Sequence, residues 1–473
     1  MIGEYQFYLG GEFCSSDEKL AVLNPYTGKV FANTSMAGNL ELDKAIDKAS
    51  AVKEDLIDFP SGKKYNILMQ IAAGIKDARE EFAGIIVAES AKPIRYARGE
   101  VDRAIQTFIV AAEEAKRLPG EYLDMEWTAP GEGKEAIVRY FPVGLVAGIA
   151  PFNFPLNLAV HKLAPAIASG CPIILKPSSS TPLTTLRLAQ IIDRTDLPKG
   201  AVSIIPMNRE TGNSMVSDDR FALLTFTGSP AVGWKMKSNA GKKKVVLELG
   251  GNAGLIVTES ADLDKAVAKS LVGSFAYSGQ VCIHTQRILV HKDVFDEFTA
   301  KFIEGVQKFR SGDPTDESTE ISAMIDEDNA KRVEEWVREA AKGGAKVLAG
   351  GKRDGGYFEP TVLTNTKNSM KVCSLEIFGP VVTIEKYTEF DRALTYINDS
   401  RYGLQAGVFT NTITEMNAAF RHLEVGGIMI NDIPGFRVDH MPYGGVKDSG
   451  FGREGVKYSM HDMLEPRLLV KDK

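Results

Sequence analysis

Two long stretches of the chain alternate short apolar segments with segments of helical periodicity. The first stretch has apolar segments at 145–150, 173–176, 202–205, 223–227 and 245–249, and helical patterns at 159–168, 184–192 and near Val232. The second has apolar segments at 255–257, 288–290, 381–384, 407–409 and 428–430, and helical patterns at 264–275, 295–309 and 392–397. Strands that alternate with helices in this way predict an α/β fold with parallel sheets.

The remaining parts of the chain have other patterns. Residues 40–116 carry apolar side chains at helical spacing, which predicts a helical region before the first stretch. The segment 119–138 is rich in Pro, Gly and acidic residues and predicts an excursion from the body of the protein. Residues 5–13 predict a hairpin whose turn is a pair of glycines. We expect a domain boundary near Gly250, between the two stretches.

Length and composition narrow the class of protein. At 473 residues the chain exceeds the size of one hydrophobic core, so two or three domains are expected. The net charge of −6 is modest and no block of Lys and Arg occurs, which argues against binding to nucleic acid or to a membrane surface. Because no apolar run is long enough to span a bilayer and the N-terminus lacks signal-peptide features, we expect a cytoplasmic protein.

The four cysteines are Cys14, Cys171, Cys282 and Cys373; they form no CxxC pair, and no zinc-ligand spacing appears. We therefore expect reduced thiols and no metal site. Cys282 follows a glycine-containing turn that comes after a predicted helix, a position that can present a thiol to substrate. Cysteine is a strong nucleophile near neutral pH. For the other three we expect a buried structural role.

Polar groups stand at the ends of several predicted strands. Glu248 ends one strand before two glycines, so its carboxylate would face a cleft, where desolvation raises its pKa toward that of a general base. Taken alone, a strand-end Glu is more often an ion-pair partner. Asn153 lies in a loop that two prolines make rigid, and its amide can donate to an oxyanion. Lys176 ends another strand and is suited to a ribose hydroxyl.

The segment 226–233 joins a predicted strand to a predicted helix, with Pro230 at the first helical position. The N–H groups at a helix start can bind a pyrophosphate. The segment differs from the GxGxxG fingerprint, and a Gly-Ser turn alone is weak evidence.

Taken together, these motifs resemble those of the aldehyde dehydrogenase superfamily. The chain contains PFNFP, KPS, FTGSxxVG, ELGGN, GQVC, EIFGP and GREG in the family's order and approximate spacing, and YLGGEF and NPYTG near the N-terminus also match. The resemblance covers essentially the whole chain. It implies a doubly wound parallel-sheet cofactor domain (1–118 and 139–249), a second α/β catalytic domain (250–447) and a small β oligomerisation element (119–138 and 448–473). It also implies a homodimer or homotetramer.

The resemblance implies a role for each motif residue. Cys282 would attack the aldehyde, Asn153 and the backbone N–H of Cys282 would stabilise the oxyanion, and hydride would pass to NAD or NADP. Glu248 would then activate the water that hydrolyses the thioester. The residues implied in binding the cofactor are Lys176 and Glu376 at the riboses, Gly228 and Ser229 at the pyrophosphate, Phe378 on the nicotinamide side, and Phe152.

Two positions depart from common family patterns. Many NAD-preferring members carry Glu three residues after the lysine, where this chain has Ser179. An acidic residue there binds the 2′-hydroxyl and repels a 2′-phosphate, so we predict that NADP is accepted. The alternative is that Ser179 is neutral and selectivity lies elsewhere. Leu375 stands where the family often has an acidic residue, but Glu376 keeps the motif position.

The segment 434–442 resembles the branch that contains lactaldehyde and non-phosphorylating glyceraldehyde-3-phosphate dehydrogenases. Arg437 could bind a carboxylate, phosphate or sulfonate, or polarise a hydroxyl group, on a small aldehyde. The alternative is a surface ion pair with Asp432 or Asp439. The substrate predicted is a small aldehyde that is hydroxylated or anionic.

Three further residues are candidates for the substrate pocket. His284 lies two residues after the proposed nucleophile and could equally point toward the core. Phe154 belongs to the proline-bounded loop. Arg103 has Glu100 three residues earlier in a predicted helix, a spacing that favours a helix-surface ion pair instead.

Two other functions compete with this prediction. Members of the superfamily that acylate coenzyme A typically lack the general base at the position of Glu248, which is present here. A catalytically inactive structural relative would not be expected to retain Cys282, Glu248, Asn153, Lys176 and Glu376 together. We therefore predict a hydrolytic, NAD(P)-dependent aldehyde dehydrogenase.

Overall fold

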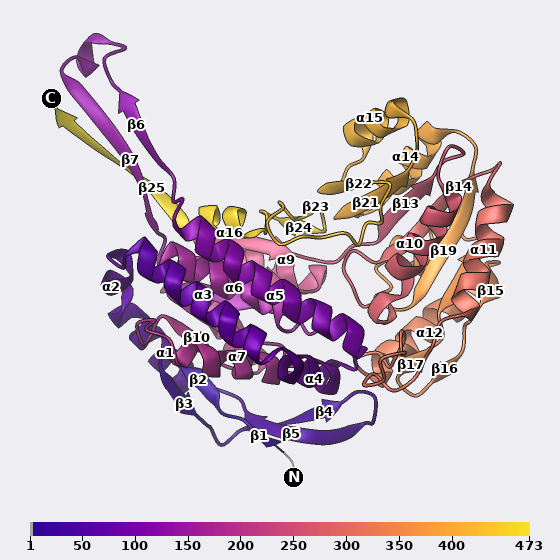
Figure 1. The fold of residues 1–473 in the computed structure, drawn as a ribbon, viewed down its shortest axis with the longest axis horizontal. Helices are drawn as coiled ribbons and strands as arrows, with labels where there is room; N and C mark the ends of the chain where they lie inside the picture. Colours follow the sequence, from indigo (N-terminus) through magenta and orange to yellow (C-terminus); the bar gives the residue numbers. More distant parts are fainter. Residues whose placement is uncertain (1–2) are drawn as a thin grey trace.

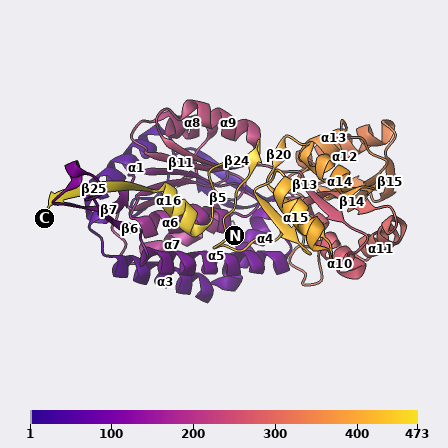
Figure 2. The ribbon, with the colours of Figure 1, turned by 90° about the horizontal axis from the view of Figure 1, so that it is seen from above.

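Two large sheets, each covered by helices, organise the protein. The computed structural model describes residues 3–473, which Figure 1 shows as two lobes with an extended arm at one end. An eight-stranded sheet forms the first lobe and a seven-stranded sheet the second, and Figure 2 shows the lobes side by side. Neighbouring strands in the centre of both sheets run parallel. The α/β architecture predicted from the sequence is therefore confirmed.

The eight-stranded sheet has a parallel centre and antiparallel strands at its borders. In spatial order its strands are β24 (Gly450–Phe451), β12 (Lys244–Glu248), β11 (Leu223–Thr227), β8 (Val146–Ile149), β9 (Ile173–Lys176), β10 (Val202–Ile204), β2 (Phe7–Leu9) and β3 (Glu12–Cys14). β8, β9 and β11 are buried on both faces, which is why they read as apolar runs. The strand order reverses between β8 and β11, and ligands of doubly wound sheets bind outside the carboxyl ends at such a point.

Helices pack on this sheet through apolar stripes. They are α1 (Asn39–Ala51), α2 (Lys53–Ile57), α3 (Ser61–Asp77), α4 (Arg79–Ser90), α5 (Ile94–Ala115), α6 (Asn157–Ser169), α7 (Leu183–Asp193), α8 (Arg209–Ser217), α9 (Pro230–Asn239) and α16 (Val456–Asp462). In α5 the buried Val101, Ala104 and Phe108 recur at helical spacing, and the helix packs on α3 and α6. The helical region predicted at 40–116 is confirmed.

The seven-stranded sheet is parallel except at one border, where β15 runs antiparallel to β18. In spatial order its strands are β15 (Lys346–Ala349), β18 (Thr361–Thr364), β19 (Val381–Tyr387), β14 (Thr285–His291), β13 (Ala253–Val257), β21 (Gln405–Phe409) and β22 (Gly427–Ile430). Its helices are α10 (Leu263–Phe275), α11 (Phe295–Gln307), α12 (Glu327–Lys342), α13 (Lys371–Ser374), α14 (Phe390–Asn398) and α15 (Ile413–His422). Within residues 3–473, β22 has no strand beside its outer edge.

Short β elements complete the lobes. They are β1 (Gly3–Glu4), β5 (Lys29–Ser35) and β4 (Lys19–Asn24) in a small sheet, and the pairs β16 (Arg353–Asp354) with β17 (Tyr357–Phe358) and β20 (Tyr402–Gly403) with β23 (Val446–Lys447). In the N-terminal hairpin of β2 and β3, Gly10 and Gly11 have φ values of +52° and +100°. Glycine adopts this left-handed region without steric cost, so the predicted glycine turn is confirmed.

The arm is a three-stranded antiparallel sheet that projects from the first lobe (Figure 1). It consists of β6 (Gly120–Asp124), the short helix η1 (Ala129–Gly131), β7 (Lys134–Pro142) and β25 (Leu464–Asp472), so it joins the predicted excursion to the C-terminal strand. Large apolar side chains are exposed on it. Tyr122, Leu468 and Leu469 are all more than half exposed, and Trp127 is 88% exposed. The arm therefore carries a larger share of exposed apolar side chains than is usual for a protein surface.

The chain passes from the first lobe to the second between β12 and β13, through Gly250 and Gly251. A Cβ atom on Gly250 would clash with the Glu376 carboxylate, and one on Gly251 would lie 2.6 Å from the carbonyl oxygen of Cys282. Only glycine allows the backbone this close to both groups. The two glycines after Glu248 therefore let the two lobes meet at the predicted site residues.

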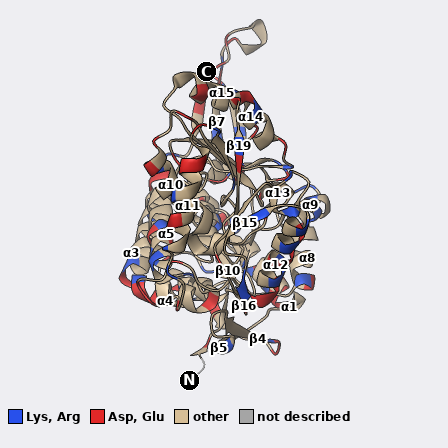
Figure 3. Cartoon of the chain, turned by 90° about the vertical axis from the view of Figure 1, so that its right-hand side faces the viewer, with Lys and Arg blue, Asp and Glu red and all other residues tan. Residues whose placement is uncertain are grey.

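Charge is mixed over the surface. On the side of the molecule seen in Figure 3, Lys and Arg are interspersed with Asp and Glu along the helices. Among the described helices, none combines the length and the apolar character that crossing a membrane requires.

Candidate active site

A cavity of about 430 Å³ brings together most of the residues predicted from the motifs. The first lobe contributes the carboxyl ends of β8, β11 and β12, and the second contributes the loop before β14, the segment after α13 and one face of α12. The lining residues are Pro151, Phe152, Asn153, Leu158, Thr227, Gly228, Ser229, Glu248, Leu249, Gly250, Cys282, Asn329, Arg332, Trp336, Glu376 and Phe378. The cavity thus begins at the strand-order reversal of the eight-stranded sheet.

A strained turn presents Cys282 to this cavity. After α10, Tyr277 and Ser278 adopt left-handed backbone angles in a short 3₁₀ turn, and Gly279 follows with a φ of +68°. Such angles are costly for residues other than glycine and persist only where packing enforces them. The Ser278 hydroxyl donates to the Ser322 carbonyl at 2.8 Å, which helps to fix the turn. Burial raises the pKa of the Cys282 thiol to about 11, although hydrogen bonding to Tyr443 opposes the shift.

Glu248 lies at the end of β12 with neither carboxylate oxygen hydrogen-bonded. Both oxygens are buried and have no partner among the described residues. Burial raises the pKa of Glu248 well above its usual value, and repulsion by Glu454 raises it further, while Arg437 opposes the shift. A carboxyl group whose oxygens are buried and unpaired can exchange a proton with a water or a reactant that enters the cavity.

Asn153 is held by a buried ion pair behind its loop. Its side-chain amide donates to the Gln280 carbonyl at 3.0 Å, two residues before Cys282. Its own carbonyl accepts from Lys92 Nζ at 2.7 Å, and Lys92 also pairs with Glu100. Glu100 accepts in turn from the backbone N–H of Leu156 at 2.9 Å. Because Lys92 and Glu100 are fully buried, the pair fixes the loop and orients the Asn153 amide toward the cysteine turn.

A second cavity of about 830 Å³ extends along α8 and α9 and contains Lys176 and Ser179. The only hydrogen bond from Lys176 Nζ to another described residue is a long one, 3.4 Å, to the Pro177 carbonyl. Burial lowers the pKa of Lys176. The lysine is therefore buried without a strong partner, as expected of a group that binds a ligand hydroxyl.

The start of α9 lies between the two cavities. Ser229 is its N-cap and makes no side-chain capping bond, and Pro230 occupies the first position. The N–H groups of Ala231 and Val232, in the first turn, face neither a capping side chain nor an earlier carbonyl, and both residues line the larger cavity. Free N–H groups at a helix start bind phosphate oxygens, so the two cavities fit a dinucleotide laid across this helix start.

Glu376 and Phe378 lie at the other side of the smaller cavity. Glu376 accepts from the Gly251 N–H at 2.9 Å, and burial raises its pKa to about 7. Phe378 has a left-handed φ of +43°, and its ring meets that of Phe152 edge-on at 5.8 Å. The two aromatic rings thus face the cavity from different lobes.

Arg437 lies inside the protein, outside the lining of the cavity that contains Cys282, and it pairs with neither Asp432 nor Asp439, the partners of the alternative surface ion pair. Its side chain is 6% exposed and pairs with Glu454 at 3.1 Å, while its guanidinium carbon lies 3.7 Å from the centroid of the Tyr443 ring. Asp432 pairs with Lys269 instead. The Nε atom of Arg437 is buried without a partner among the described residues. A loop that folds back over the first lobe, rather than over the surface, accounts for the difference.

Arg103 pairs with Asp439 at 2.7 Å, so the ion pair predicted with Glu100 is wrong. Glu100 points into the protein toward Lys92, because that face of α5 packs on the loop that contains Asn153. Arg103 instead reaches across to the segment after Arg437. It does not line the cavity that contains Cys282.

His284 and Phe154 also lie outside the cavity lining. His284 is buried, and burial lowers its pKa to about 4, so the core-facing alternative describes its position. The Phe154 ring lies 3.9 Å from Lys92 Nζ and packs edge-on to Tyr277. It therefore supports the buried ion pair behind Asn153.

Sequence reasoning missed three buried polar residues beside the site: Lys162, Tyr443 and Glu454. Lys162 Nζ pairs with Glu454 at 3.0 Å. Burial opposes ionisation of Glu454, but Lys162 and Arg437 hold its pKa at about 2. Tyr443 Oη lies 3.0 Å from Cys282 Sγ. The sequence offers two signals for them. Lys162 is the one lysine in α6, most of whose residues are apolar, and Glu454 lies within the GREG motif.

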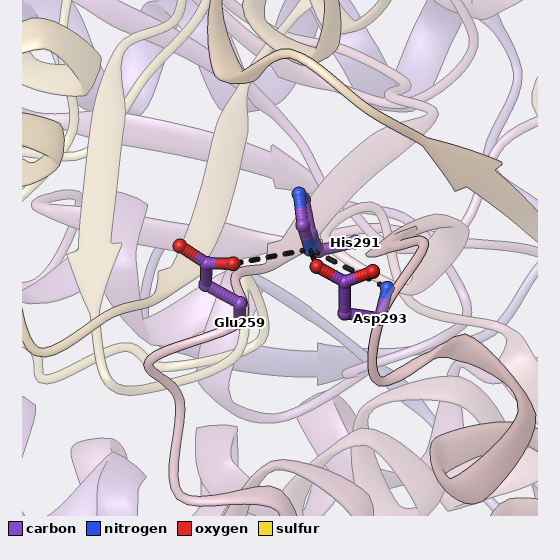
Figure 4. Close-up of side chains that lie close together, drawn as sticks. All are labelled: Glu259, His291 and Asp293. Carbon is purple, nitrogen blue, oxygen red and sulfur yellow. Dashed lines mark hydrogen bonds and ion pairs between the residues drawn. The ribbon is translucent and has the colours of Figure 1, made fainter.

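A group of potential metal ligands lies elsewhere in the second lobe. Figure 4 shows Glu259, His291 and Asp293, whose ligand atoms lie within 4.8 Å of one another. The group follows the carboxyl ends of β13 and β14, whereas Cys282 precedes the amino end of β14. His291 Nδ1 lies 3.7 Å from the Glu259 carboxylate and 3.6 Å from that of Asp293, and both carboxylates are largely exposed. An exposed ion-pair cluster accounts for this arrangement.

Comparison with known proteins adds a family and several relatives. Residues 13–469 match the model of the aldehyde dehydrogenase family. The 3-sulfolactaldehyde dehydrogenase of Priestia aryabhattai is 45% identical over 471 residues, which cover 99% of this chain and 98% of the relative. The lactaldehyde dehydrogenase of Methanocaldococcus jannaschii is 40% identical over 461 residues, 96% of this chain and 98% of the relative.

Two solved structures are also similar. Aldehyde dehydrogenase 21 from Physcomitrella patens, in complex with the product succinate, has a TM-score of 0.98 and 45% identity, covering 100% of this chain and 99% of that one. The glyceraldehyde-3-phosphate dehydrogenase GapN from Methanocaldococcus jannaschii, complexed with NADP, has a TM-score of 0.93 and 40% identity, covering 97% of this chain and 100% of that one.

Proposed function

The chain belongs to the aldehyde dehydrogenase family, and we propose that Cys282, Glu248 and Asn153 carry out its reaction, the oxidation of a small hydroxylated or anionic aldehyde with NAD(P)+. One observation carries the assignment. A half-buried thiol, an unpaired buried carboxyl group and an amide donor line one cavity, next to a helix start with free N–H groups.

The first half of the reaction forms a thioester. The Cys282 thiol loses its proton to solvent, and the sulfur bonds to the aldehyde carbon. The carbonyl oxygen then carries a negative charge, and the Asn153 amide and the Cys282 N–H donate to it. When bound, the nicotinamide ring accepts the hydride that leaves this carbon. Asn153 keeps hold of the same oxygen as the carbonyl of the thioester re-forms.

The second half hydrolyses the thioester. Glu248, as a carboxylate, takes a proton from water while the water oxygen attacks the thioester carbon. The C–S bond breaks, the carboxylic acid leaves and the thiolate of Cys282 returns. One aldehyde, one oxidised cofactor and one water are consumed, and one carboxylic acid, one reduced cofactor and one proton are formed. The presence of Glu248 favours this hydrolysis over transfer to coenzyme A.

We propose that Lys176 and Glu376 hold the two riboses, that Gly228 and Ser229 approach the pyrophosphate, and that Phe152 and Phe378 flank the nicotinamide. NADP is expected to be accepted. Ser179 leaves the larger cavity without the acidic side chain that would repel a 2′-phosphate, and Arg209 and Lys235 line the same cavity. The similar GapN structure was solved with NADP.

Arg437 is the residue that we propose to recognise the polar end of the aldehyde. Its guanidinium is nearly buried, retains an unpaired Nε and stacks on the tyrosine that touches Cys282 Sγ. The relatives are named for sulfolactaldehyde and lactaldehyde, and one similar structure holds succinate. These molecules share a small carbon chain with a charged or hydroxylated end, which a guanidinium binds through charge-assisted hydrogen bonds.

Initial rates of NAD(P)H formation without coenzyme A test this proposal, with 3-sulfolactaldehyde, lactaldehyde, succinic semialdehyde and propanal as substrates. Arg437→Met should raise KM for the anionic aldehydes by about 10- to 100-fold, the effect of losing one charged hydrogen bond, and change that for propanal little. Lys269→Met, which removes another cation paired with the same loop, is the control. Equal losses for propanal and the anions would contradict the role of Arg437.

We further propose that the first lobe (1–118 and 139–249) binds the cofactor, that the second (250–447) bears the nucleophile, and that the arm joins subunits into a homodimer or homotetramer. The exposed apolar side chains of the arm and the open edge of β22 support association with a second copy. A nucleophile that must remain a reduced thiol supports a cytoplasmic location.

A further inference from the structure

Tyr443 is the described side chain that makes a hydrogen bond to the sulfur of Cys282, with Oη and Sγ 3.0 Å apart. The ring is 3% exposed and its position is fixed by the backbone. Tyr443 N–H donates to the Glu454 carbonyl at 2.9 Å, and Glu454 N–H donates to the Tyr443 carbonyl at 2.6 Å. The hydroxyl is therefore held against the sulfur by a reciprocal pair of backbone bonds.

The direction of this bond depends on the state of the sulfur. Tyrosine and thiol can each donate, but a thiolate can only accept. Burial raises the pKa of Tyr443 well above its ordinary value, so the phenol keeps its proton when the thiol loses its own. Toward the thiolate, Tyr443 is then a charge-assisted donor.

Arg437 lies over the face of the Tyr443 ring. Its guanidinium carbon lies 3.7 Å from the ring centroid, and its pairing with Glu454 keeps it there. A cation over an aromatic face interacts with the ring's electrons. The residue proposed to bind the substrate's polar end and the sulfur that attacks its carbonyl are thus separated by one phenol ring.

We propose that Tyr443 is a catalytic residue that donates a hydrogen bond to the thiolate of Cys282 and so increases the fraction of enzyme with an ionised nucleophile. The inference rests on the proposed role of Cys282. As the sulfur bonds to the aldehyde carbon, negative charge moves to the carbonyl oxygen held by Asn153, and the bond from Tyr443 weakens. Neither bonding nor proton transfer to Tyr443 is required.

A hydrogen bond to the thiolate has two opposing effects on the rate of alkylation, and this makes the proposal testable. A hydrogen bond that lowers a thiol's pKa also lowers the reactivity of its thiolate, with a Brønsted coefficient of about 0.4–0.5. One unit of pKa therefore gives about tenfold more thiolate but a net rate gain of only about threefold below the pKa. Above the pKa, the same bond slows the reaction.

Brief alkylation of Cys282 by iodoacetamide between pH 6.5 and 12, without aldehyde or cofactor, followed by mass spectrometry, tests the proposal. Circular dichroism at each pH checks that the protein stays folded during the exposure. Tyr443→Phe should react about threefold more slowly at pH 7.5, should shift the midpoint of the profile upward by about one unit, and should approach or exceed the wild-type rate at the highest pH. Tyr387→Phe removes another buried hydroxyl, which donates to the Val257 carbonyl, and should leave the profile unchanged.

An unchanged profile in Tyr443→Phe, or the same fractional loss at every pH, would overturn the proposal, because altered packing alone predicts no crossover. The outcome is separable from that of the proposed function. A shifted profile in an enzyme that oxidises none of the aldehydes would support Tyr443 and contradict the reaction. Turnover of the aldehydes by an enzyme with an unshifted alkylation profile would support the reaction and contradict the role of Tyr443.

Discussion

Burial disfavours the charged forms of the two reactive groups in the cavity, because it raises the pKa of both Cys282 and Glu248 above their usual values. Ionised Glu454 lies nearby, paired with Lys162 and Arg437. The environment therefore pushes the pKa values of two neighbouring glutamates in opposite directions, which assigns them different tasks.

Glu248→Gln should leave the first turnover and abolish the later ones. Hydride transfer needs no base at this position once the thiolate has formed, whereas hydrolysis of the thioester does. We expect a burst of NAD(P)H of about one equivalent, then a steady rate lower by roughly 100- to 10,000-fold. Stopped-flow absorbance at 340 nm measures both phases.

The same variant has a pH signature. Glu248 has a raised pKa, so its carboxylate form, which takes the proton from water, is lost as pH falls through that pKa. Wild-type deacylation should therefore speed up as pH rises, and the residual rate of Glu248→Gln should lack this dependence. A lost burst would instead assign Glu248 to the first half of the reaction.

Ser179→Glu should shift cofactor use toward NAD. The added carboxylate would enter the cavity that contains Lys176 and repel a 2′-phosphate, so kcat/KM for NADP should fall by about 10- to 100-fold while that for NAD changes less. Ser180→Glu places the same charge one residue away, on an exposed side chain, and is the matched control. Equal effects of the two variants would show that selectivity lies elsewhere.

At this scale the sequence predicts the motif residues but not their long-range partners. Asn153, Glu248 and Cys282 share a cavity because each stands at a strand end or a glycine turn, a local signal. Arg103 and Arg437 pair with residues that local spacing does not indicate, since folding brings them together across long stretches of chain. Nothing in the sequence around Tyr443 indicates that its side chain contacts the Cys282 sulfur.

Among the elements, strands buried on both faces were predicted best. The segments predicted at 173–176 and 223–227 coincide with β9 and β11. The apolar patterns predict no element between residues 310 and 380, although α12, β15 and β18 lie there. The buried positions of α12 are Ala330, Val333, Val337 and Ala340, which recur at helical spacing among charged residues, so the sequence does carry a periodic signal for this helix.

α12 matters because Asn329, Arg332 and Trp336 on one of its faces line the active-site cavity. Its N-cap, Asp326, accepts from the Asn329 N–H at 2.7 Å. Asp326→Ala should destabilise the protein by about 1 kcal/mol and loosen the first turn, which raises KM for NAD(P). Thermal unfolding and initial rates measure the two effects.

Asp262→Ala is the matched control for this prediction. Asp262 caps α10 through the Lys265 N–H at 3.1 Å, and none of the first turn of α10 lines the cavity. The Asp262→Ala variant should lose a similar amount of stability, but its KM for NAD(P) should be unchanged. If both variants raise KM equally, general destabilisation rather than the position of α12 explains the result.

The whole molecule exposes its apolar surface unevenly, with much of it on the arm. Leu468 and Val470 lie on one face of β25 and are 54% and 43% exposed. Leu468→Glu with Val470→Glu should place charges in the proposed subunit contact and reduce the mass measured by light scattering at micromolar concentration. Leu40→Glu changes another exposed leucine, on α1, and should leave the measured mass unchanged. A monomeric wild type would refute the assignment of the arm.

The two places where the chain passes between the lobes set how the lobes can move. One is the glycine pair between β12 and β13, and the other lies between β23 in the second lobe and β24 in the first. Both border Glu248, which pairs with Gly450 of β24, and the first lies close to the Cys282 carbonyl. In a hinge rotation, atoms near the pivot move least and those far from it move most. Opening of the lobes would thus widen the outer cavity for cofactor exchange while the nucleophile and its base keep their spacing.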